Sequence, residues 1–257
     1  MTRERVLKLP VLEIFGPTFQ GEGRAIGQKT MFVRTAGCDY HCDWCDSAFT
    51  WDGSEKPTRM TADEVIEALD ALGTYDYVTL SGGNPALLAA NMAELVSKLK
   101  ARGVTLAVET QGSRWQEWLK DIDQVTLSPK PPSSKMEVNM ETPGSIDHDG
   151  SLLDYCRLHD ITLQAWSPFQ MPAWQGCFLG NDEYPELNQK IHVLAEKYNV
   201  SDTTIAAAWI LRHPANMQII TGTASESRLK EIIAACEITL TREEWYELYL
   251  AAGHPLP

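Results

Sequence analysis

Short apolar strands alternate with helical segments through the first half of the chain, and this alternation limits the folds open to it. Strand patterns at 77–80, 105–109 and 124–127 are separated by helices expected at 86–102 and 113–120. Short buried strands that alternate with helices are typical of a parallel sheet. In such sheets the functional loops follow the carboxyl ends of the strands. The sequences AGCDYHCDWC, SGGNP, ETQG and SPKPP stand at those positions.

Three cysteines lie directly after the strand pattern at 30–36, in a C-x3-C-x2-C run formed by Cys38, Cys42 and Cys45. Thiolates at this spacing can hold three irons of a [4Fe-4S] cube and leave the fourth iron open to a small-molecule ligand. This is the layout of a radical SAM site. Two alternatives stay open: a zinc site with His41 as the fourth ligand, and three ordinary buried cysteines. The polar loop disfavours core packing.

The bulk composition is that of an ordinary globular chain of 257 residues, 44% hydrophobic and 22% charged. No apolar run reaches membrane-spanning length, and the opening MTRERVLKLP lacks the apolar stretch of a signal peptide. We therefore expect a cytoplasmic protein without a membrane partner, in a reducing compartment that suits free thiols. The net charge of -13 argues against a nucleic-acid partner, because such binding depends on basic contacts to phosphate.

The sequence changes in kind after Met136. The first 136 residues carry 15 basic and 18 acidic side chains, whereas the remainder carries 7 and 17. A βα pattern continues without the glycine-rich or cysteine-bearing loops. We expect strands at 137–140, 162–168 and 217–222, and helices at 152–160, 185–199, 202–212, 225–235 and the acidic C-terminal segment TREEWYELYLAAG.

The loop sequences of the first half resemble those of a known family. FGPTFQGEG, FVRTAGC, CDYHCDWCDS, SGGNPALL, ETQG and SPKPPSSK together are similar to 7-carboxy-7-deazaguanine synthase, and the resemblance covers residues 10–135. That radical SAM family converts 6-carboxy-5,6,7,8-tetrahydropterin to 7-carboxy-7-deazaguanine in queuosine and deazapurine biosynthesis. The resemblance implies a [4Fe-4S] cluster, S-adenosyl-L-methionine (SAM) and Mg2+ as cofactors. It also implies a pterin substrate, an external electron donor such as flavodoxin, and a homodimer.

The resemblance assigns roles to residues of this chain, none of them a catalytic side chain. The metal ligands would be Cys38, Cys42 and Cys45 for the cluster and Ser47 for Mg2+, which prefers hard oxygen donors. SAM would be bound by Trp44, Asp46, Gly82, Gly83, Glu109, Ser128, Pro129 and Lys130. The substrate would contact Phe19, Gln20, Gly21, Glu22, Arg34 and Ser81.

Two of these assignments have plain structural alternatives. Arg34 suits a carboxylate, because a guanidinium binds it through two parallel hydrogen bonds, but a salt bridge at a strand edge is the alternative. Gly82 and Gly83 allow the backbone to approach SAM closely, and the alternative is an ordinary turn at a strand end.

From about Met136 the chain resembles the C-terminal part of an aldo-keto reductase, through EVNM, DYCRLHDITLQAWSPF, AAAWILRHP and MQIITGTASESRLKEI. In that family Trp166 would stack on the nicotinamide, and residues 222–225 with Arg228 would hold the 2'-phosphate. The resemblance therefore implies residual affinity for NADP. The alternatives are that Trp166 is a core residue and that Arg228 is a surface charge. The catalytic tetrad of the family stands on early barrel strands that are replaced here. Tyr155 and His159 are interpreted as one helix face.

We therefore expect a chimeric α/β chain joined near 135–137. Residues 1–135 would form a radical SAM core, a partial (β/α) barrel of radical SAM type. Residues 136–257 would form the C-terminal half-barrel of a TIM-barrel aldo-keto reductase. The two sets of strands would pair into an incomplete barrel or remain two poorly closed halves. The leading hypothesis is a radical SAM lyase impaired by the exchanged C-terminus; the alternatives are an NADPH-dependent reductase and a chain without turnover.

Overall fold

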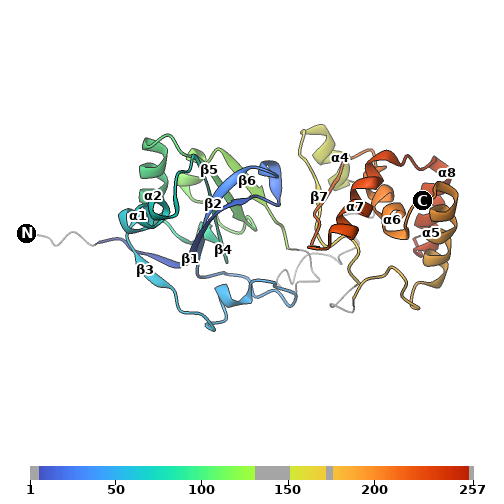
Figure 1. Cartoon of the computed structure of the whole chain (residues 1–257). Coiled ribbons are helices and arrows are strands. Elements are labelled where there is room, and N and C mark those ends of the chain that lie inside the picture. The colour runs from blue at the N-terminus through green and yellow to red at the C-terminus, as the bar shows by residue number, and fades with distance from the viewer. Residues whose placement is uncertain (1–5, 131–150, 172–175, 255–257) are drawn as a thin grey trace, which may run out of the picture. The chain divides into compact units, whose positions relative to one another are not determined.

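The computed structural model describes residues 6–130, 151–171 and 176–254, and the chain falls into two compact units, 1–141 and 142–257 (Figure 1). The predicted junction at 135–137 and the strand expected at 137–140 lie outside the described residues.

The first unit is built on a six-stranded sheet of order β3-β1-β2-β4-β5-β6. Its strands are β1 (Leu9–Phe19), β2 (Lys29–Thr35), β3 (Thr58–Met60), β4 (Tyr77–Gly82), β5 (Thr105–Thr110) and β6 (Gln124–Leu127). From β2 to β6 the neighbours are parallel, which confirms the predicted parallel sheet. The strand β1 pairs antiparallel with both β2 and β3, an arrangement that the local pattern did not predict.

Helices α1 (Ala62–Leu72) and α2 (Ala90–Ala101) belong to the same unit. The capping box expected at the start of α1 is confirmed, because Thr61 Oγ1 accepts from the Glu64 amide and Glu64 Oε2 accepts from the Thr61 amide. Short 3-10 helices complete the unit: η1 (Gly23–Ala25), η2 (Ala48–Thr50), η3 (Pro85–Leu87) and η4 (Glu117–Asp121).

Two predicted helices of this unit differ from the structure, one in its start and one in its type and length. The helix expected at 86–102 begins only at Ala90, because the Asn84 side chain accepts from the Ala86 amide and closes the separate turn η3. The helix expected at 113–120 is the 3-10 turn η4. There the Trp118 indole donates to the Leu88 carbonyl over 2.8 Å, so this short segment is fixed by tertiary contacts rather than by a helical ladder.

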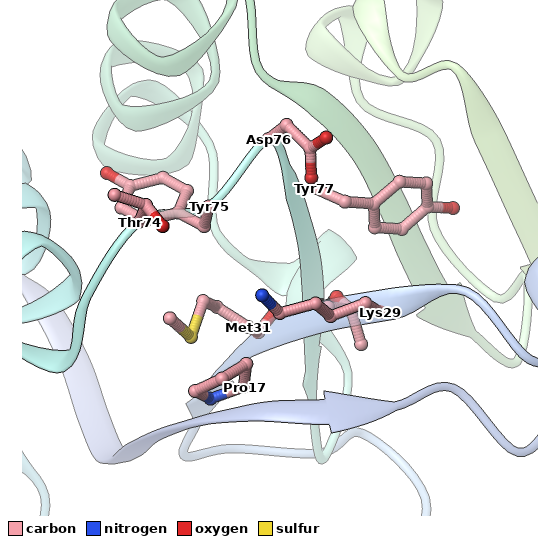
Figure 2. A pocket seen from close by; sticks show the side chains of 8 residues that line it. Pro17, Lys29, Met31, Thr74, Tyr75, Asp76 and Tyr77 are labelled. Carbon is pink, nitrogen blue, oxygen red and sulfur yellow. Dashed lines mark hydrogen bonds between the residues drawn. The ribbon is translucent and has the colours of Figure 1, made fainter.

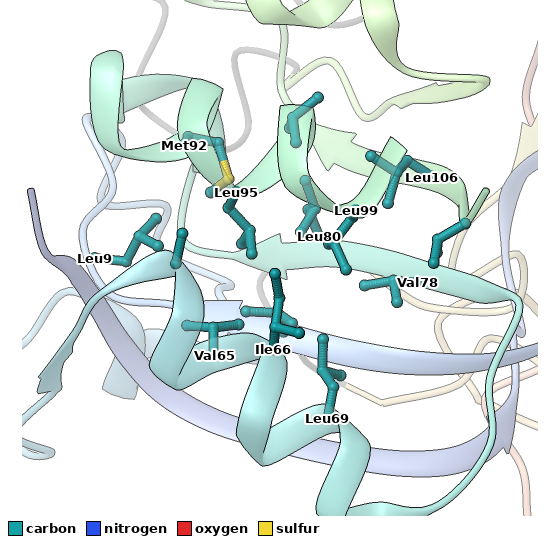
Figure 3. Packing of buried hydrophobic residues seen from close by; sticks show 14 of the residues in the cluster. Leu9, Val65, Ile66, Leu69, Val78, Leu80, Met92, Leu95, Leu99 and Leu106 are labelled. Atoms are coloured by element: carbon teal, nitrogen blue, oxygen red, sulfur yellow. The ribbon is translucent and has the colours of Figure 1, made fainter. Parts of the chain in front are cut away.

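The main core lies between the sheet and the two α-helices (Figure 3). Leu69, Leu80, Leu95, Leu99 and Leu106 are fully buried there. Full burial of a leucine side chain contributes about 1.5–3 kcal/mol relative to its exposure. Because side chains alternate along a strand, the residues between these core positions point to the opposite face of the sheet.

That opposite face carries three of the predicted site residues on neighbouring strands. Arg34 on β2 is in register with Ser81 on β4, and Glu109 on β5 follows Val108, the partner of Leu80. The Ser81 hydroxyl donates to Glu109 Oε2 over 2.7 Å. The sheet register therefore brings these residues together, although they are distant in sequence.

The strand β6 stands at one end of the six-stranded sheet. Val125 and Leu127 on this strand are 46% and 60% exposed. Apolar side chains on an edge strand are a surface that favours pairing with other chains.

The second unit is mainly helical. Its elements are α4 (Ser151–Leu158), β7 (Gln164–Ala165), α5 (Pro185–Tyr198), α6 (Asp202–Leu211), β8 (Gln218–Ile219), α7 (Glu226–Ala234), η7 (Ala235–Glu237) and α8 (Arg242–Ala251). The predicted helices are confirmed, and the buried side chains of this unit include Ile191 on α5, Ile205 on α6 and Leu240 in the loop before α8.

The strands predicted at 162–168 and 217–222 are only two residues long, β7 and β8, and they pair in parallel. Ser167 has a φ of 47°, a left-handed conformation that a strand residue does not adopt, so β7 ends before it. No helix in the described ranges is both long enough and apolar enough to cross a membrane.

Candidate functional site

The loop between β2 and β3, residues 36–57, carries the three cysteines and is called the cysteine loop. It leaves the carboxyl end of β2 and folds back on itself. The Gly37 amide donates to the Thr50 carbonyl over 2.7 Å, and the Cys45 amide donates to the Cys42 carbonyl over 3.1 Å. Cys42 is buried, whereas Cys38 and Cys45 are half-buried. None of the six cysteines, all within the described ranges, forms a disulfide bond.

N–H groups point at the sulfur atoms of Cys38 and Cys45. Cys38 Sγ accepts from the Tyr40 amide at 3.4 Å and from Gln111 Nε2 at 3.5 Å. Cys45 Sγ accepts from the Trp51 indole at 3.4 Å. Hydrogen bonds to ligand sulfurs are one of the means by which proteins tune iron-sulfur clusters.

Burial and the neighbouring Asp39 carboxylate raise the pKa of Cys38 to about 11, although the hydrogen bond from Gln111 acts in the opposite direction. A metal must therefore displace a proton from this thiol when it binds.

The cysteine loop supplies the thiol donors that an iron-sulfur cube requires. In the described ranges, no three His, Cys, Asp or Glu side chains gather closely enough to ligate one metal ion. In a [4Fe-4S] cube each thiolate binds a different iron, so the ligands stand further apart than those of zinc. The ring of His41 stacks on that of Trp51 at 4.5 Å. Three thiols on one loop, with N–H donors to Cys38 and Cys45 among them, are a donor set that suits a cube.

An open cavity of about 240 Å³ lies beside Cys38. Its walls are residues 36–38, Phe49, Thr50, Trp51, Gly53, Glu55 and Pro57. A second cavity, drawn in Figure 2, lies where β4 begins, between Pro17, Met31 and Tyr75. It encloses about 10 Å³, enough for about one water molecule. The larger cavity is therefore the one that adjoins the predicted site.

The two glycines of SGGNP lie against the protein's own backbone. Gly82 has a φ of +137°, and a Cβ there would lie less than 3.0 Å from the Thr35 carbonyl oxygen. A Cβ at Gly83 would lie less than 3.0 Å from the Gly37 carbonyl oxygen and from Cys38 Cβ. The loop after β4 thus requires glycine in order to contact the cysteine loop, a reason that sequence reasoning did not supply.

Glu109 gathers predicted substrate residues around its carboxylate. Gln20 Nε2 donates to Oε1 over 2.8 Å, and Ser81 Oγ donates to Oε2. Burial raises the pKa of Glu22, and the negative charges of Glu109 and Asp46 raise it further. The structure therefore places the FQGEG loop, β4 and β5 around one acidic cluster.

A second group joins the cysteine loop to the end of β6. Lys130 Nζ donates to Ser128 Oγ over 2.8 Å and lies 5.6 Å from the centre of the Trp44 ring. On the cysteine loop, Ser47 Oγ donates to Asp46 Oδ1 over 3.1 Å. Predicted SAM-binding residues from both segments are thus close together. Pro129 lies between Ser128 and Lys130.

Arg34 forms the salt bridge that was the structural alternative. It pairs with Glu13, its register partner on β1, and its guanidinium lies 5.4 Å and 5.5 Å from the ring centres of Phe15 and Phe49. A substrate contact through Arg34 stays a prediction. Phe19, the last residue of β1, is 72% exposed, and Gly21 in the following loop is also exposed.

In the second unit, the residues proposed for NADP are largely exposed. Trp166 is 40% exposed after β7, and Arg228 is exposed on α7. The Ser225 amide, at the start of α7, is bonded to Thr223 Oγ1. The rings of Tyr155 and His159 are tilted by 43° with their centres 4.4 Å apart, as expected for neighbours on one helix face.

Sequence reasoning missed the polar residues that join the loops of the first unit. Asp39 accepts from Asn84, Gln111 and Ser113, and Trp51 donates to Cys45. Asp39 and Asn84 each stand next to a residue that the motifs singled out, and this adjacency was the available signal.

Comparison with known proteins gives two kinds of match. The model of the Aldo/keto reductase family matches residues 45–249, a range that begins earlier than the expected junction. The 7-carboxy-7-deazaguanine synthase of Bacillus cereus is 59% identical over 138 residues, which cover 52% of this chain and 58% of the relative. That of Bacillus subtilis is 53% identical over 161 residues, with coverage of 61% and 65%. The chain thus spans 58–65% of the length of these curated relatives.

Among solved structures, QueE from Escherichia coli matches with a TM-score of 0.42 and 24% identity, over 48% of this chain and 61% of that one. An aldo/keto reductase from Klebsiella pneumoniae in complex with NADP and acetate matches with a TM-score of 0.45 and 19% identity, over 76% and 65%. Through its family match the chain belongs to the aldo/keto reductase family, and its N-terminal half is similar to 7-carboxy-7-deazaguanine synthases at 53–59% identity.

Proposed function

We propose that the chain is a radical SAM enzyme that converts 6-carboxy-5,6,7,8-tetrahydropterin to 7-carboxy-7-deazaguanine. The observation that carries the proposal is the three-cysteine loop at the carboxyl end of β2. It is in contact with the loop after β4, with Gln111 after β5 and with Lys130 after β6. The high identity to synthases over the same half of the chain supports it.

The cysteines would hold the [4Fe-4S] cluster, and Ser47 would offer its hydroxyl to Mg2+. When bound, the cluster and SAM supply the electron and the hydrogen-abstracting radical of this chemistry. The chain's own residues bind and orient. Lys130 and Trp44 form a cationic and aromatic wall for SAM, and Gly82 and Gly83 keep the neighbouring backbone close to the cysteine loop.

The pterin would lie against the face that carries Gln20, Glu22, Ser81 and Glu109. A carboxyl with a raised pKa, such as that of Glu22, retains its proton to higher pH and can donate it to a ring acceptor. Arg34 would use the guanidinium N–H groups that its bond to Glu13 leaves over for the substrate carboxylate.

The fold fits the same proposal. The parallel strands β2, β4, β5 and β6 would be a partial barrel of radical SAM type, and residues 136–257 the C-terminal half-barrel of a reductase. The junction near residue 136 removes the segment that closes the site in full-length synthases, so we infer impaired turnover. An external electron donor such as flavodoxin and a homodimer complete the proposal.

The test is anaerobic reconstitution of the cluster, followed by assay of 5'-deoxyadenosine with and without the pterin. Formation of 5'-deoxyadenosine that requires both iron and dithionite supports the radical SAM function, and 7-carboxy-7-deazaguanine identifies the reaction. A reconstituted protein that binds iron and sulfide without cleaving SAM refutes it.

The family match makes an NADPH-dependent reductase the second candidate. Exposed Trp166 and the start of α7 would be its cofactor site. The family resemblance places the catalytic tetrad on strands that this chain replaces, so binding without reduction is the expectation for this half.

A further inference from the structure

Asp39 is the meeting point of three loops of the first unit. Its Oδ1 accepts from Asn84 Nδ2 at 3.0 Å and from Gln111 Nε2 at 2.6 Å, and its Oδ2 accepts from Ser113 Oγ at 2.8 Å. Arg114 Nε lies 3.6 Å from Oδ2. Only a carboxylate offers two oxygens and no N–H to such a set of donors.

Asn84 is the most constrained of these partners. It is 1% exposed, and its amide makes four hydrogen bonds: Oδ1 accepts from Ala86 N and Thr110 Oγ1, and Nδ2 donates to Asp39 and Ser113. Rotation of the side chain would leave buried polar atoms without partners, at a cost of about 1–3 kcal/mol for each. The orientation of the amide toward Asp39 is therefore fixed.

The main chain adds a second connection between the same loops. The Asn84 amide donates to the Gly37 carbonyl over 2.8 Å, and the Gly83 amide donates to the Thr35 carbonyl over 3.2 Å. Cys38 lies between Gly37 and Asp39, so both of its neighbours are held by Asn84. Gln111 then contacts both Asp39 and Cys38 Sγ.

We propose that Asp39 is a positioning residue, which acts through Asn84 and Gln111 to set Cys38 relative to the loops after β4 and β5. The inference rests on the proposed function, because those loops are where SAM would bind. A displaced Cys38 would move the cluster away from the SAM that these loops hold. In this role Asp39 contacts neither the cluster nor SAM.

A reciprocal exchange tests the pair. The single variant Asp39→Asn sets two amides against each other, and Asn84→Asp sets two carboxylates against each other. The double variant Asp39→Asn with Asn84→Asp restores one amide opposite one carboxylate at the wild-type net charge. The measurement is the SAM concentration that produces half of the SAM-induced change in the EPR spectrum of the reduced cluster.

We expect this concentration to rise about 10- to 100-fold in each single variant, as for other residues that orient metal ligands. In the double variant it should return part of the way to wild type, because the pair with position 84 is restored while Gln111 loses its carboxylate partner. Asp52→Asn is the charge control, because Asp52 is an exposed carboxylate bonded to Ser54; it should bind SAM as the wild type does. Should Asn84→Asp fail to fold, Ser113→Ala removes one donor to Asp39 and should give a smaller rise than Asp39→Asn.

Several outcomes would overturn the inference. One is an Asp39→Asn variant that binds SAM as tightly as the wild type. Another is a double variant whose half-saturating SAM concentration rises by the product of the two single-variant increases. A lower melting temperature of the apo-protein and lower cluster loading, with unchanged SAM affinity in the molecules that load, would show a structural role instead. A wild-type cluster that never responds to SAM would refute the proposed function first, and the inference with it.

Discussion

Trp209 and Trp245 exchange hydrogen bonds: the indole N–H of each donates to the backbone carbonyl of the other, both over 3.0 Å. Their rings are nearly parallel, at 7°, with centres 4.8 Å apart. Trp209 lies in the last turn of α6, where carbonyl groups lack intrahelical partners. The pair therefore stabilises the contact between α6 and α8.

Trp245→Phe should lower stability by about 0.5–1.5 kcal/mol, because the ring stack remains while the Trp209 carbonyl loses its indole donor. Trp245→Ala should cost more, up to about 3 kcal/mol, since it also removes the stacked ring. Urea denaturation followed by circular dichroism measures both. Tyr246→Phe on the same helix is the control, and an unchanged midpoint in Trp245→Phe would contradict the role of the hydrogen bond.

Replacement of Cys42 by alanine should abolish iron-sulfur absorption and SAM cleavage, and Cys38→Ala and Cys45→Ala should do the same. A cube that loses one of its three protein ligands is not retained. The matched control is Cys236→Ala, because Cys236 is exposed and belongs to the second unit. Equal cluster loading in the Cys42→Ala protein would sink the radical SAM proposal.

Glu244 should make stability depend on pH in the acid range. Its side chain is 9% exposed and accepts from Lys197 Nζ at 2.5 Å and from Tyr198 Oη at 2.7 Å. Burial alone would raise the pKa of Glu244, but the hydrogen bonds from Lys197, the Thr241 amide and Tyr198 outweigh burial and lower it. A carboxyl with a lowered folded pKa stabilises above its unfolded pKa, and this stability is lost as the pH falls through the folded value.

The difference in urea midpoint between wild type and Glu244→Gln should therefore be full at pH 7 and shrink below about pH 4.3, the ordinary pKa of glutamate. Glu247→Gln on the same helix should show a much smaller difference, because Glu247 is 53% exposed and its salt bridge to Lys190 is solvated. A Glu244→Gln difference that is constant from pH 7 to pH 3 would contradict this assignment.

NADPH should not reduce simple aldehydes above background in the presence of this chain, although weak binding through residues 221–228 is expected. As proposed above, the strands that carry the family's catalytic side chains are replaced in the first half of the chain. The rate of NADPH oxidation measures this directly. Sustained oxidation that disappears in Trp166→Ala would show a working reductase site.

SAM cleavage should run ahead of product formation. If residues 136–257 replace the closing segment of the synthases, as proposed, the pterin should be held loosely, and misplacement of about 1 Å can cost roughly a hundredfold in rate. The measurement is the ratio of 5'-deoxyadenosine to 7-carboxy-7-deazaguanine, beside a full-length relative. Equal ratios would show that residues 137–257 close the site adequately.

Much of the fold could be predicted because its signals are local. The capping pair Thr61 and Glu64 marks the start of α1, and apolar runs mark the strands β4 and β5. The antiparallel strand β1 escaped prediction, because Gly16 and Pro17 break its pattern and its partners are set by tertiary pairing. The strand predicted over 162–168 ends early because Ser167 adopts a left-handed backbone conformation. Nothing in the residue types around Ser167 predicts that conformation.

The site was predictable only at the level of loops. Strand ends of a parallel sheet meet at one edge, so the motif residues near Cys38, Gly83 and Glu109 were expected together. The contacts within that edge depend on sheet register. The bond between Asp39 and Ser113 spans 74 residues, and the pairing of Arg34 with Glu13 follows from the register of β1 against β2. Neither is encoded in a local pattern.

The backbone contact at Gly82 and Gly83 bears on how a mutational library of this chain should be interpreted. Any side chain there collides with the Thr35 or Gly37 carbonyl, so both codons would be depleted in a screen for folded protein as much as in a screen for activity. Depletion of variants at these glycines therefore indicates a steric requirement of the fold, whether the screen selects for folding or for activity. Asn84, one position further, can change its hydrogen-bonding atoms without a change in size, so the fitness of its variants carries the information on chemistry.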